Sequence, residues 1–308
     1  MFRNSILLTL LLALPVMAED PTSQPAAETQ HECVGCAAKE LDFVSLEFGG
    51  QLTTAYYARG ILQENQGVIG QPWAEIQLHL FQKDFVSDIY VFARTWNSFH
   101  SGPSGSESNF SSSPASWYES SFSAGLGVKL CNALTVSGGY TINFSPNDRF
   151  DTIEELFLRG DLDDRFLWKG FDNEYIQFDG IRPYGLFAWE SDGQRDAGRN
   201  RGVYAEVGIN PGITLTPDPE FTARISAPIT VGLNIFEYYE TPNKGDAPYG
   251  FTNVGLRGEL PLGWIPSKYG EWTLFVQGTW YHLDQNLSKL NSEDNTGLIA
   301  SGGLTFNY

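Results

Sequence analysis

Apolar and polar residues alternate with a period of two along most of this chain. The alternation starts at Val44, Leu46 and Phe48 and is still present at the last residues, Phe306 and Tyr308. Successive residues of a β-strand point to opposite faces, so each such segment has one apolar face and one polar face. The pattern predicts twelve strands: Val44–Ala58, Trp73–Gln82, Phe85–Asn97, Trp117–Leu130, Leu134–Phe144, Phe150–Arg159, Arg182–Trp189, Val203–Leu215, Arg224–Tyr239, Phe251–Leu260, Trp272–Leu283 and Gly297–Tyr308.

The sixth strand has two possible positions. Asp151–Arg159 could instead form a short loop helix, with Asp151 and Glu154 as its capping box. In that case Phe171–Phe178 would be the strand, followed by a turn at Asp179 and Gly180. Both choices keep the number of predicted strands at twelve.

The same alternation fits a soluble β-sandwich or a transmembrane β-barrel. The segments run about 10 to 14 residues, enough for a tilted strand to cross a membrane, whereas globular strands average about 5 to 6 residues. No apolar run reaches the roughly 18 residues that a spanning helix needs. We therefore predict an all-β fold, an antiparallel transmembrane β-barrel of about 12 strands.

Aromatic residues gather near the ends of these segments, as the two aromatic girdles of a membrane barrel require. They are Tyr56, Tyr57, Trp73, Trp96, Trp117, Tyr118, Tyr238, Tyr239, Trp272, Trp280 and Tyr281. The last strand carries Phe306 and Tyr308 on its apolar face, which resembles the assembly signal of bacterial outer-membrane barrels. That resemblance implies outer-membrane lipid and the barrel-assembly machinery as partners of the chain.

The connections between the predicted strands differ in length on the two sides of the barrel. The long ones fall mainly on one side: Gly60–Pro72, Phe99–Ser116, Ser145–Arg149, Glu190–Gly202, Glu240–Tyr249 and Asp284–Thr296. Short turns at Lys83-Asp84 and Cys131–Ala133 lie on the other side, together with the insertion Gly160–Ile181. Barrels of this kind have short periplasmic turns and long outer loops.

The N-terminal residues predict export. A basic residue, Arg3, precedes the apolar core 6–14, and small residues up to Ala18 form a cleavage site. We expect residues 1–18 to be a signal peptide, residues 19–40 a periplasmic linker, and residues 41–308 the outer-membrane barrel.

Two of the three cysteines, Cys33 and Cys36, lie in the predicted linker. In an exported protein such a pair forms a disulfide more often than a metal site or a redox pair, and we expect a disulfide here. Cys131 lies outside this pair, and the sequence gives it no role.

Composition narrows the class of partner. Only 18% of the residues are charged, and 37 acidic residues stand against 19 basic ones, for a net charge of −18. Nucleic-acid binding needs clustered basic residues, so we predict no nucleic-acid partner.

Several segments resemble the TorF-like family of bacterial outer-membrane porins. They are Thr53–Ile61, Gln71-Pro72, Ile89–Ser98, Pro183-Tyr184, Gly202–Glu206 and Gly302–Phe306. The resemblance covers most of Leu41–Tyr308, but Ala55 stands where the family usually has an acidic residue. It implies a pore in the outer membrane of a Gram-negative bacterium that passes small solutes or ions.

Charged residues on the polar strand faces are expected to point into the barrel, because Arg or Lys facing lipid costs about 2–4 kcal/mol at the midplane. These lumen-lining candidates are Glu47, Arg59, Glu75, Asp88, Arg94, Glu119, Lys129, Glu155, Arg159, Glu206, Arg224, Arg257 and Glu259. They form either an ion-pair network in a narrow or plugged interior, or a pore lining that selects solutes by charge. The same parity turns Phe92, Trp96, Tyr204 and Phe275 inward, which indicates a narrow lumen.

Acidic and basic residues nearly balance in this inward set, so selectivity would come mainly from acidic residues at the mouth. These are Asp192, Glu240, Asp246, Glu293 and Asp294. Their negative field predicts a channel with a weak cation preference.

Two alternatives to a passive channel remain open. Ser98 and His100 share one strand face near the outer rim, where a base could activate a nucleophile in an outer-membrane hydrolase. The sequence identifies no third residue to orient them, and we predict no enzyme. The other alternative is a structural or surface-interaction barrel with a sealed lumen.

We predict no metal site and no cofactor. The acidic runs Asp161–Asp164 and Ser292–Asn295 do not match a calcium-binding loop. His79 is expected to form hydrogen bonds in the lumen.

Overall fold

The structure is a computed structural model that describes residues 43–83, 85–102, 116–195, 200–218, 221–241 and 245–308. The expected signal peptide, the linker, and Cys33 and Cys36 lie outside the described residues. Their predicted roles therefore remain predictions.

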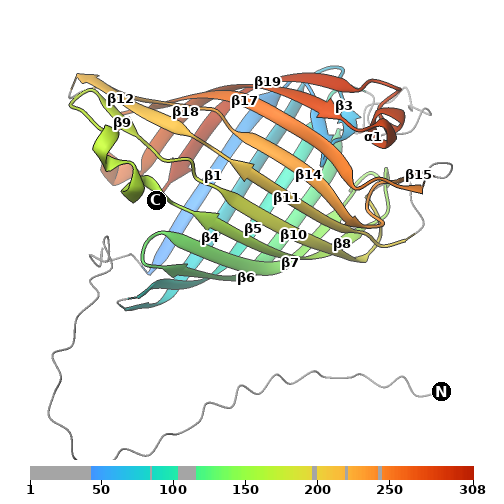
Figure 1. Ribbon diagram of the computed structural model, residues 1–308, viewed down its shortest axis with the longest axis horizontal. Coiled ribbons are helices and arrows are strands. Elements are labelled where there is room, and N and C mark those ends of the chain that lie inside the picture. Colours follow the sequence, from blue (N-terminus) through green and yellow to red (C-terminus); the bar gives the residue numbers. More distant parts are fainter. Residues whose placement is uncertain (1–42, 84, 103–115, 196–199, 219–220, 242–244) are drawn as a thin grey trace, which may run out of the picture. The chain divides into compact units, whose positions relative to one another are not determined.

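Twelve antiparallel strands close into a barrel (Figure 1). In ring order these are β1 (Val44–Thr53), β4 (Ile69–Lys83), β5 (Val86–His100), β6 (Trp117–Leu130), β7 (Leu134–Phe144), β8 (Ile153–Leu162), β10 (Tyr184–Asp192), β11 (Val203–Ile209), β14 (Ile229–Phe236), β17 (Tyr249–Pro261), β18 (Glu271–Leu283) and β19 (Thr296–Asn307). The ring closes where β1 pairs with β19, from Glu47 opposite Asn307 to Thr53 opposite Ser301. The predicted twelve-stranded all-β barrel is confirmed, and β8 occupies the first of the two positions considered for the sixth strand.

The outer face of the barrel is apolar. Its exposed side chains include Phe122 at 49%, Leu256 at 63%, Val276 at 61% and Leu298 at 76% of their full surface. Soluble proteins rarely expose contiguous apolar surface of this extent, whereas a membrane barrel turns such a face to lipid. The alternation of the sequence is therefore the alternation of lipid-facing and lumen-facing residues.

Within the described residues, no helix is long and apolar enough to cross a membrane.

The two ends of the barrel differ in their connections. At one end, here called the terminal end, β1 begins and β19 ends (Figure 1). This end also carries η3 (Ser267–Tyr269) and a tight turn in which Cys131 and Asn132 have φ of 48° and 52°. The opposite end, here called the loop end, carries β2 (Tyr56–Ala58), β3 (Ile61–Glu64), the short ladder of β15 (Glu240–Thr241) with β16 (Gly245–Asp246), and α1 (Gln285–Leu290).

Two predicted strands are broken where the sequence suggested continuous ones. Val203–Leu215 divides into β11 and β12 (Gly212–Asp218), and Arg224–Tyr239 falls in β13 (Phe221–Ser226) and β14. The breaks lie at Pro211 and Pro228, because proline has no N–H to donate to a neighbouring strand. β12 and β13 thus extend the sheet beyond the ring at the terminal end.

The segment between β8 and β10 joins this extension. It contains η1 (Arg165–Leu167), η2 (Lys169–Phe171) and β9 (Ile176–Phe178), and β9 pairs with β12. The second position considered for the sixth strand therefore contributes only these three residues of strand, outside the ring. As predicted, this insertion lies on the same side as the short turns.

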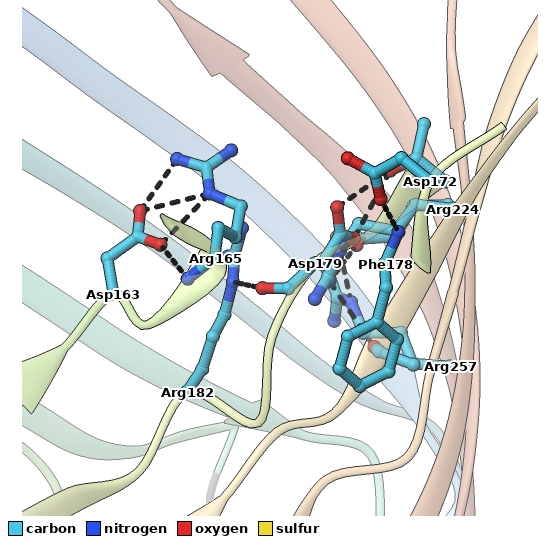
Figure 2. Close-up of polar contacts among 11 residues, drawn as sticks. Asp163, Arg165, Asp172, Phe178, Asp179, Arg182, Arg224 and Arg257 are labelled. Atoms are coloured by element: carbon cyan, nitrogen blue, oxygen red, sulfur yellow. Dashed lines mark hydrogen bonds and ion pairs between the residues drawn. The ribbon is translucent and has the colours of Figure 1, made fainter. Parts of the chain in front are cut away.

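Figure 2 shows the polar contacts of the extension and of the loop that precedes it. Arg224 Nε lies 2.6 Å from Asp179 Oδ2, and Arg182 Nε donates to the Asp179 carbonyl at 3.0 Å. Arg165 Nη2 lies 2.6 Å from Asp163 Oδ2. Burial by itself would raise the pKa of Asp163, but the hydrogen bonds from Arg165 outweigh it and hold that pKa below its ordinary value. In the same acidic run, Asp164 accepts from the backbone amides of Ile181 at 3.1 Å and Arg182 at 2.8 Å, and so fixes this loop.

The first predicted strand ends earlier than expected. β1 stops at Thr53, and the chain then forms a separate hairpin from β2 and β3 before β4 starts at Ile69. Residues 54–68 are therefore neither the end of a barrel strand nor a simple outer loop.

The aromatic residues at segment ends divide into two groups. Trp272 packs against Phe48 and Phe306 near the terminal end, while Trp117 and Trp280 are exposed on the outer face. Tyr238 and Tyr239, each 1% exposed, pack in a core inside the barrel, and Tyr56 and Tyr57 belong to the hairpin. Those four tyrosines are not girdle residues as predicted, because the chain turns inward where they occur. Tyr118, 2% exposed, and Trp96, which lines the lumen, are not girdle residues either, because their side chains point into the barrel.

Barrel closure leads to a prediction about assembly. Deleting residues 306–308 removes the pairing of Phe306 with Phe48 and the two hydrogen bonds between Leu46 and Tyr308. Unpaired backbone groups in lipid each cost several kcal/mol, so we expect loss of the compact, heat-modifiable barrel on gel electrophoresis. Trp264→Ser, in an exposed turn, serves as control and should assemble. Normal yield of heat-modifiable barrel from the truncated chain would contradict this role for the closing strands.

Candidate functional site

The hairpin of β2 and β3, residues Tyr56–Glu64, folds into the barrel and is here called the inner hairpin. Its turn residues Arg59 and Gly60 have φ of 49° and 86°, as a two-residue type I′ turn requires. A Cβ on Gly60 would lie 2.7 Å from Leu287 of α1, so the turn also needs glycine for this close approach. The turn therefore places Arg59 at the tip of the hairpin, inside the lumen.

Arg59 attaches this tip to the opposite wall. Its guanidinium forms a two-pronged ion pair with Glu155 of β8, with Nη2 donating to Oε2 at 2.9 Å. Nη1 also donates to the Tyr238 hydroxyl at 2.9 Å, and the guanidinium lies 4.5 Å from the ring centre of Tyr204. Planar guanidinium groups suit such paired and stacked contacts, so the tip has one preferred position.

Asn291, just after α1, holds the backbone of the turn. Its side-chain amide donates to the Gly60 carbonyl at 2.8 Å and accepts from the Leu62 amide at 2.7 Å. These two bonds satisfy the edge of β3 as a neighbouring strand would.

The base of the hairpin contacts β5 through three buried side chains. His100 Nδ1 lies 2.8 Å from Glu64 Oε2, and His100 Nε2 lies 2.7 Å from Ser98 Oγ. Glu64 is the third residue that the sequence did not identify, and the order of groups is that of a nucleophile, a base and an orienting carboxylate. Yet Ser98 is 0% exposed and His100 and Glu64 are each 2% exposed. In this conformation the three residues tie β3 to the wall.

An apolar core fills the loop end around the hairpin. Its buried residues come from the hairpin, five different strands or loops, and α1: Ile61, Ala188, Tyr204, Tyr238, Tyr239, Phe251, Leu283 and Leu287. Because these side chains exclude water from that part of the lumen, the hairpin narrows the barrel at the loop end.

On the terminal-end side of the hairpin, the lumen contains a cavity of about 580 Å³. Its wall combines aromatic side chains (Tyr56, Tyr90, Phe92, Trp96 and Phe157), hydroxyl groups of β6 and β7, and eight charged residues. Glu75 lines this cavity and also a hollow at the terminal end beside Glu47 and Asn307. The cavity therefore lies next to the terminal-end hollow and ends at the inner hairpin.

Six of the predicted lumen charges line this cavity: Arg59, Glu75, Arg94, Glu119, Glu155 and Arg159. Arg159 pairs with Asp161 at 2.6 Å, and Glu119 accepts hydrogen bonds from Tyr56 at 2.9 Å and Arg195 at 3.2 Å. The alternation of the sequence predicted that Arg59 points inward from a barrel strand. In the structure it reaches the cavity from the tip of the inner hairpin instead.

The other predicted charges lie elsewhere in the barrel. Arg224, Arg257 and Glu259 form one ion-pair group near the terminal end, with 2.7 Å and 3.0 Å contacts to Glu259. The remaining four have separate surroundings: Asp88 pairs with His79, Glu206 accepts from Tyr204, Glu47 accepts from Trp73, and Lys129 lines a second hollow.

Sequence reasoning missed several residues that position the hairpin, chiefly Glu64, Asn291 and Arg195. No spacing rule connects them, because they lie in three different loop-end segments. The one available signal was Arg59-Gly60, which can form a tight turn between two short strands.

No family model and no curated relative matches this sequence. Similar solved structures include the NanC porin, at 12% identity and a TM-score of 0.40, covering 85% of this chain and 98% of that one. An outer membrane channel from Pseudomonas putida F1 is similar at 11% identity and a TM-score of 0.44, covering 86% and 94%. The transport unit of the autotransporter AIDA-I from Escherichia coli gives 9% identity, a TM-score of 0.43, and coverage of 88% and 92%. These values are low, so the functional inference depends on the geometry of this chain.

The Arg59–Glu155 pair predicts how firmly the hairpin is held. Arg59→Ala leaves Glu155, whose side chain is 4% exposed, without its cation. Breaking a buried pair costs about 3–5 kcal/mol, so we expect proteinase K to cleave residues 56–64 much faster in this variant. Arg201→Ala removes an exposed pair, 55% and 64% exposed, and should change nothing, because such pairs contribute about 0–1 kcal/mol. Equal cleavage of R59A and wild type would contradict the anchoring role.

Proposed function

We propose that this chain is a porin-like channel of a Gram-negative outer membrane, which passes small solutes or ions passively and is narrowed by its inner hairpin. The observation that carries the proposal is a closed barrel with an apolar outer face and a polar, charged cavity of about 580 Å³ inside. A barrel that served only as a membrane anchor would have no need of a cavity lined by charged and hydroxyl side chains.

The orientation follows from the connections. In single-chain bacterial barrels both termini and the short turns face the periplasm. By this rule the terminal end is periplasmic, and the loop end with the inner hairpin faces outward. This orientation agrees with a signal peptide at residues 1–18 and with assembly through the strand that carries Phe306 and Tyr308. The resemblance to TorF-like porins supports the same assignment.

Charge selection in the cavity should be weak. Four basic residues line it (Arg59, Arg94, Arg159 and Arg195), against four acidic ones (Glu75, Glu119, Glu155 and Asp161), so the charges cancel. The net charge of the whole chain is −18, and acidic residues such as Asp192 and Glu293 lie in loop-end segments. We infer a weak preference for cations that arises at the mouth.

A sealed structural barrel is the main alternative, and the dense core around the hairpin favours it. A hydrolase that uses Ser98 and His100 has the geometry of the side chains in its favour. Substrate could reach this group only if the inner hairpin moved out of the lumen, because Ser98, His100 and Glu64 are all buried.

Conductance distinguishes a channel from a sealed barrel. We expect refolded wild type to form small, stable conductance steps in a planar bilayer. Replacing residues 55–66 by a short Gly-Ser linker should raise the step size several-fold, because the narrowest part of the lumen is removed. R201A, which should fold with its hairpin intact because it loses only an exposed ion pair, serves as the matched control. Absence of steps from wild type, with steps appearing only after hairpin removal, would show that the native barrel is sealed.

Salt dependence tests where selectivity arises. A negative field at a water-filled mouth is screened over about 8–10 Å at physiological ionic strength. We therefore expect reversal potentials in a KCl gradient to show a cation preference in dilute salt that fades as salt rises. A chloride preference, or a cation preference that salt does not change, would show that lumen charges set selectivity instead.

A further inference from the structure

Two opposite charges in the lumen cavity have no ion-pair partner among the residues that the structure describes. Of the four basic residues that line the cavity, Arg59, Arg159 and Arg195 each pair with a carboxylate. Arg94 forms no such pair and its side chain is exposed to the cavity. Glu75 accepts only a hydrogen bond from the Gln77 amide, at 2.6 Å.

These two residues lie side by side. Glu75 of β4 and Arg94 of β5 are directly paired in the sheet, which sets their Cα atoms about 4.5–5.5 Å apart on the same face. Their charged groups nevertheless form no ion pair with each other. The cavity wall therefore offers a carboxylate and a guanidinium, near each other and both available to a ligand.

A third polar residue lines the same cavity. Asn143 of β7 lines it and is 5% exposed, yet its amide nitrogen has no hydrogen-bond partner in the described structure. Asn143 lies opposite Ser121, which in turn lies opposite Trp96, one row from Arg94. Asn143 therefore adds an amide side chain to this part of the cavity wall.

Aromatic side chains flank the guanidinium along β5. Phe92 and Trp96 precede and follow Arg94 on the inward face, and Phe157 lies 6.3 Å from Phe92 between ring centres. Pockets for small ligands commonly combine apolar walls with a few placed polar groups in volumes of roughly 300–1,000 Å³.

We propose that this cavity binds zwitterionic amino acids with an apolar or aromatic side chain. The ligand carboxylate binds Arg94, its ammonium group binds Glu75, and its side chain packs on Phe92 and Trp96. A ligand with one charge would leave one of the two wall charges without a counterpart. A ligand that carries both an ammonium and a carboxylate group is therefore favoured. This inference rests on the proposed channel function and names the class of solute that the channel would take.

Binding can be measured without any conductance. Isothermal titration of L-phenylalanine, 3-phenylpropionate and phenethylamine into detergent-refolded barrel compares three ligands of similar shape. The second ligand lacks the ammonium group and the third lacks the carboxylate. We expect L-phenylalanine to bind, and the other two to bind at least about tenfold more weakly, since hydrogen bonds to charged groups are among the stronger ones.

Variants of the two charges sharpen the test. Arg94→Gln should weaken L-phenylalanine binding at least about tenfold and Glu75→Gln similarly, while Arg94→Lys should retain part of it and R201Q all of it. Heat-modifiability of each variant verifies its fold. Absence of L-phenylalanine binding, equal binding of either single-charge ligand, or unchanged binding by R94Q would overturn the proposal. Binding by a barrel that conducts no ions would refute the channel function and leave the site standing.

Discussion

The Arg59 guanidinium lies between the Glu155 carboxylate, the Tyr238 hydroxyl and the Tyr204 ring, where the apolar core meets the lumen cavity. A buried charge is tolerated only when its partner and its hydrogen bonds are in place, so this pair can exist in one arrangement of the hairpin. The position of residues 56–64 across the lumen depends on that arrangement. The apolar core, the contact with α1 and the depth of the cavity all follow from it.

Two layers of the lumen therefore have different chemistry. Near the loop end, charges are paired and buried among tyrosine rings, and they fix the hairpin. Farther toward the terminal end, the cavity keeps Glu75 and Arg94 available beside aromatic side chains and hydroxyl groups. The inward charges thus lie at two levels of the barrel: an ion-pair network around the hairpin and the wall of the cavity.

The barrel itself could be predicted because a lipid-facing strand must alternate apolar and polar residues at every position. That requirement is local, so Leu134–Phe144 and Trp272–Leu283 were located from their own residues. The broken strands at Pro211 and Pro228 were not anticipated, since alternation continues through both prolines. The inner hairpin also escaped prediction, because Tyr56–Ala58 continues the alternation of β1 while the chain has already left the wall. Its anchors, Glu155, His100 and Asn291, are distant in sequence and meet only after the ring has closed.

Hydrogen–deuterium exchange over residues 56–64 in the native, membrane-inserted barrel tests most directly whether the inner hairpin is a fixed part of the lumen. The amide of Leu62 donates to Asn291, and the hairpin is enclosed by the barrel wall. Its amides should therefore exchange as slowly as those of the barrel strands. Exchange as fast as that of exposed loop residues would show that the hairpin lies outside the lumen, and the account of a narrowed channel would be wrong.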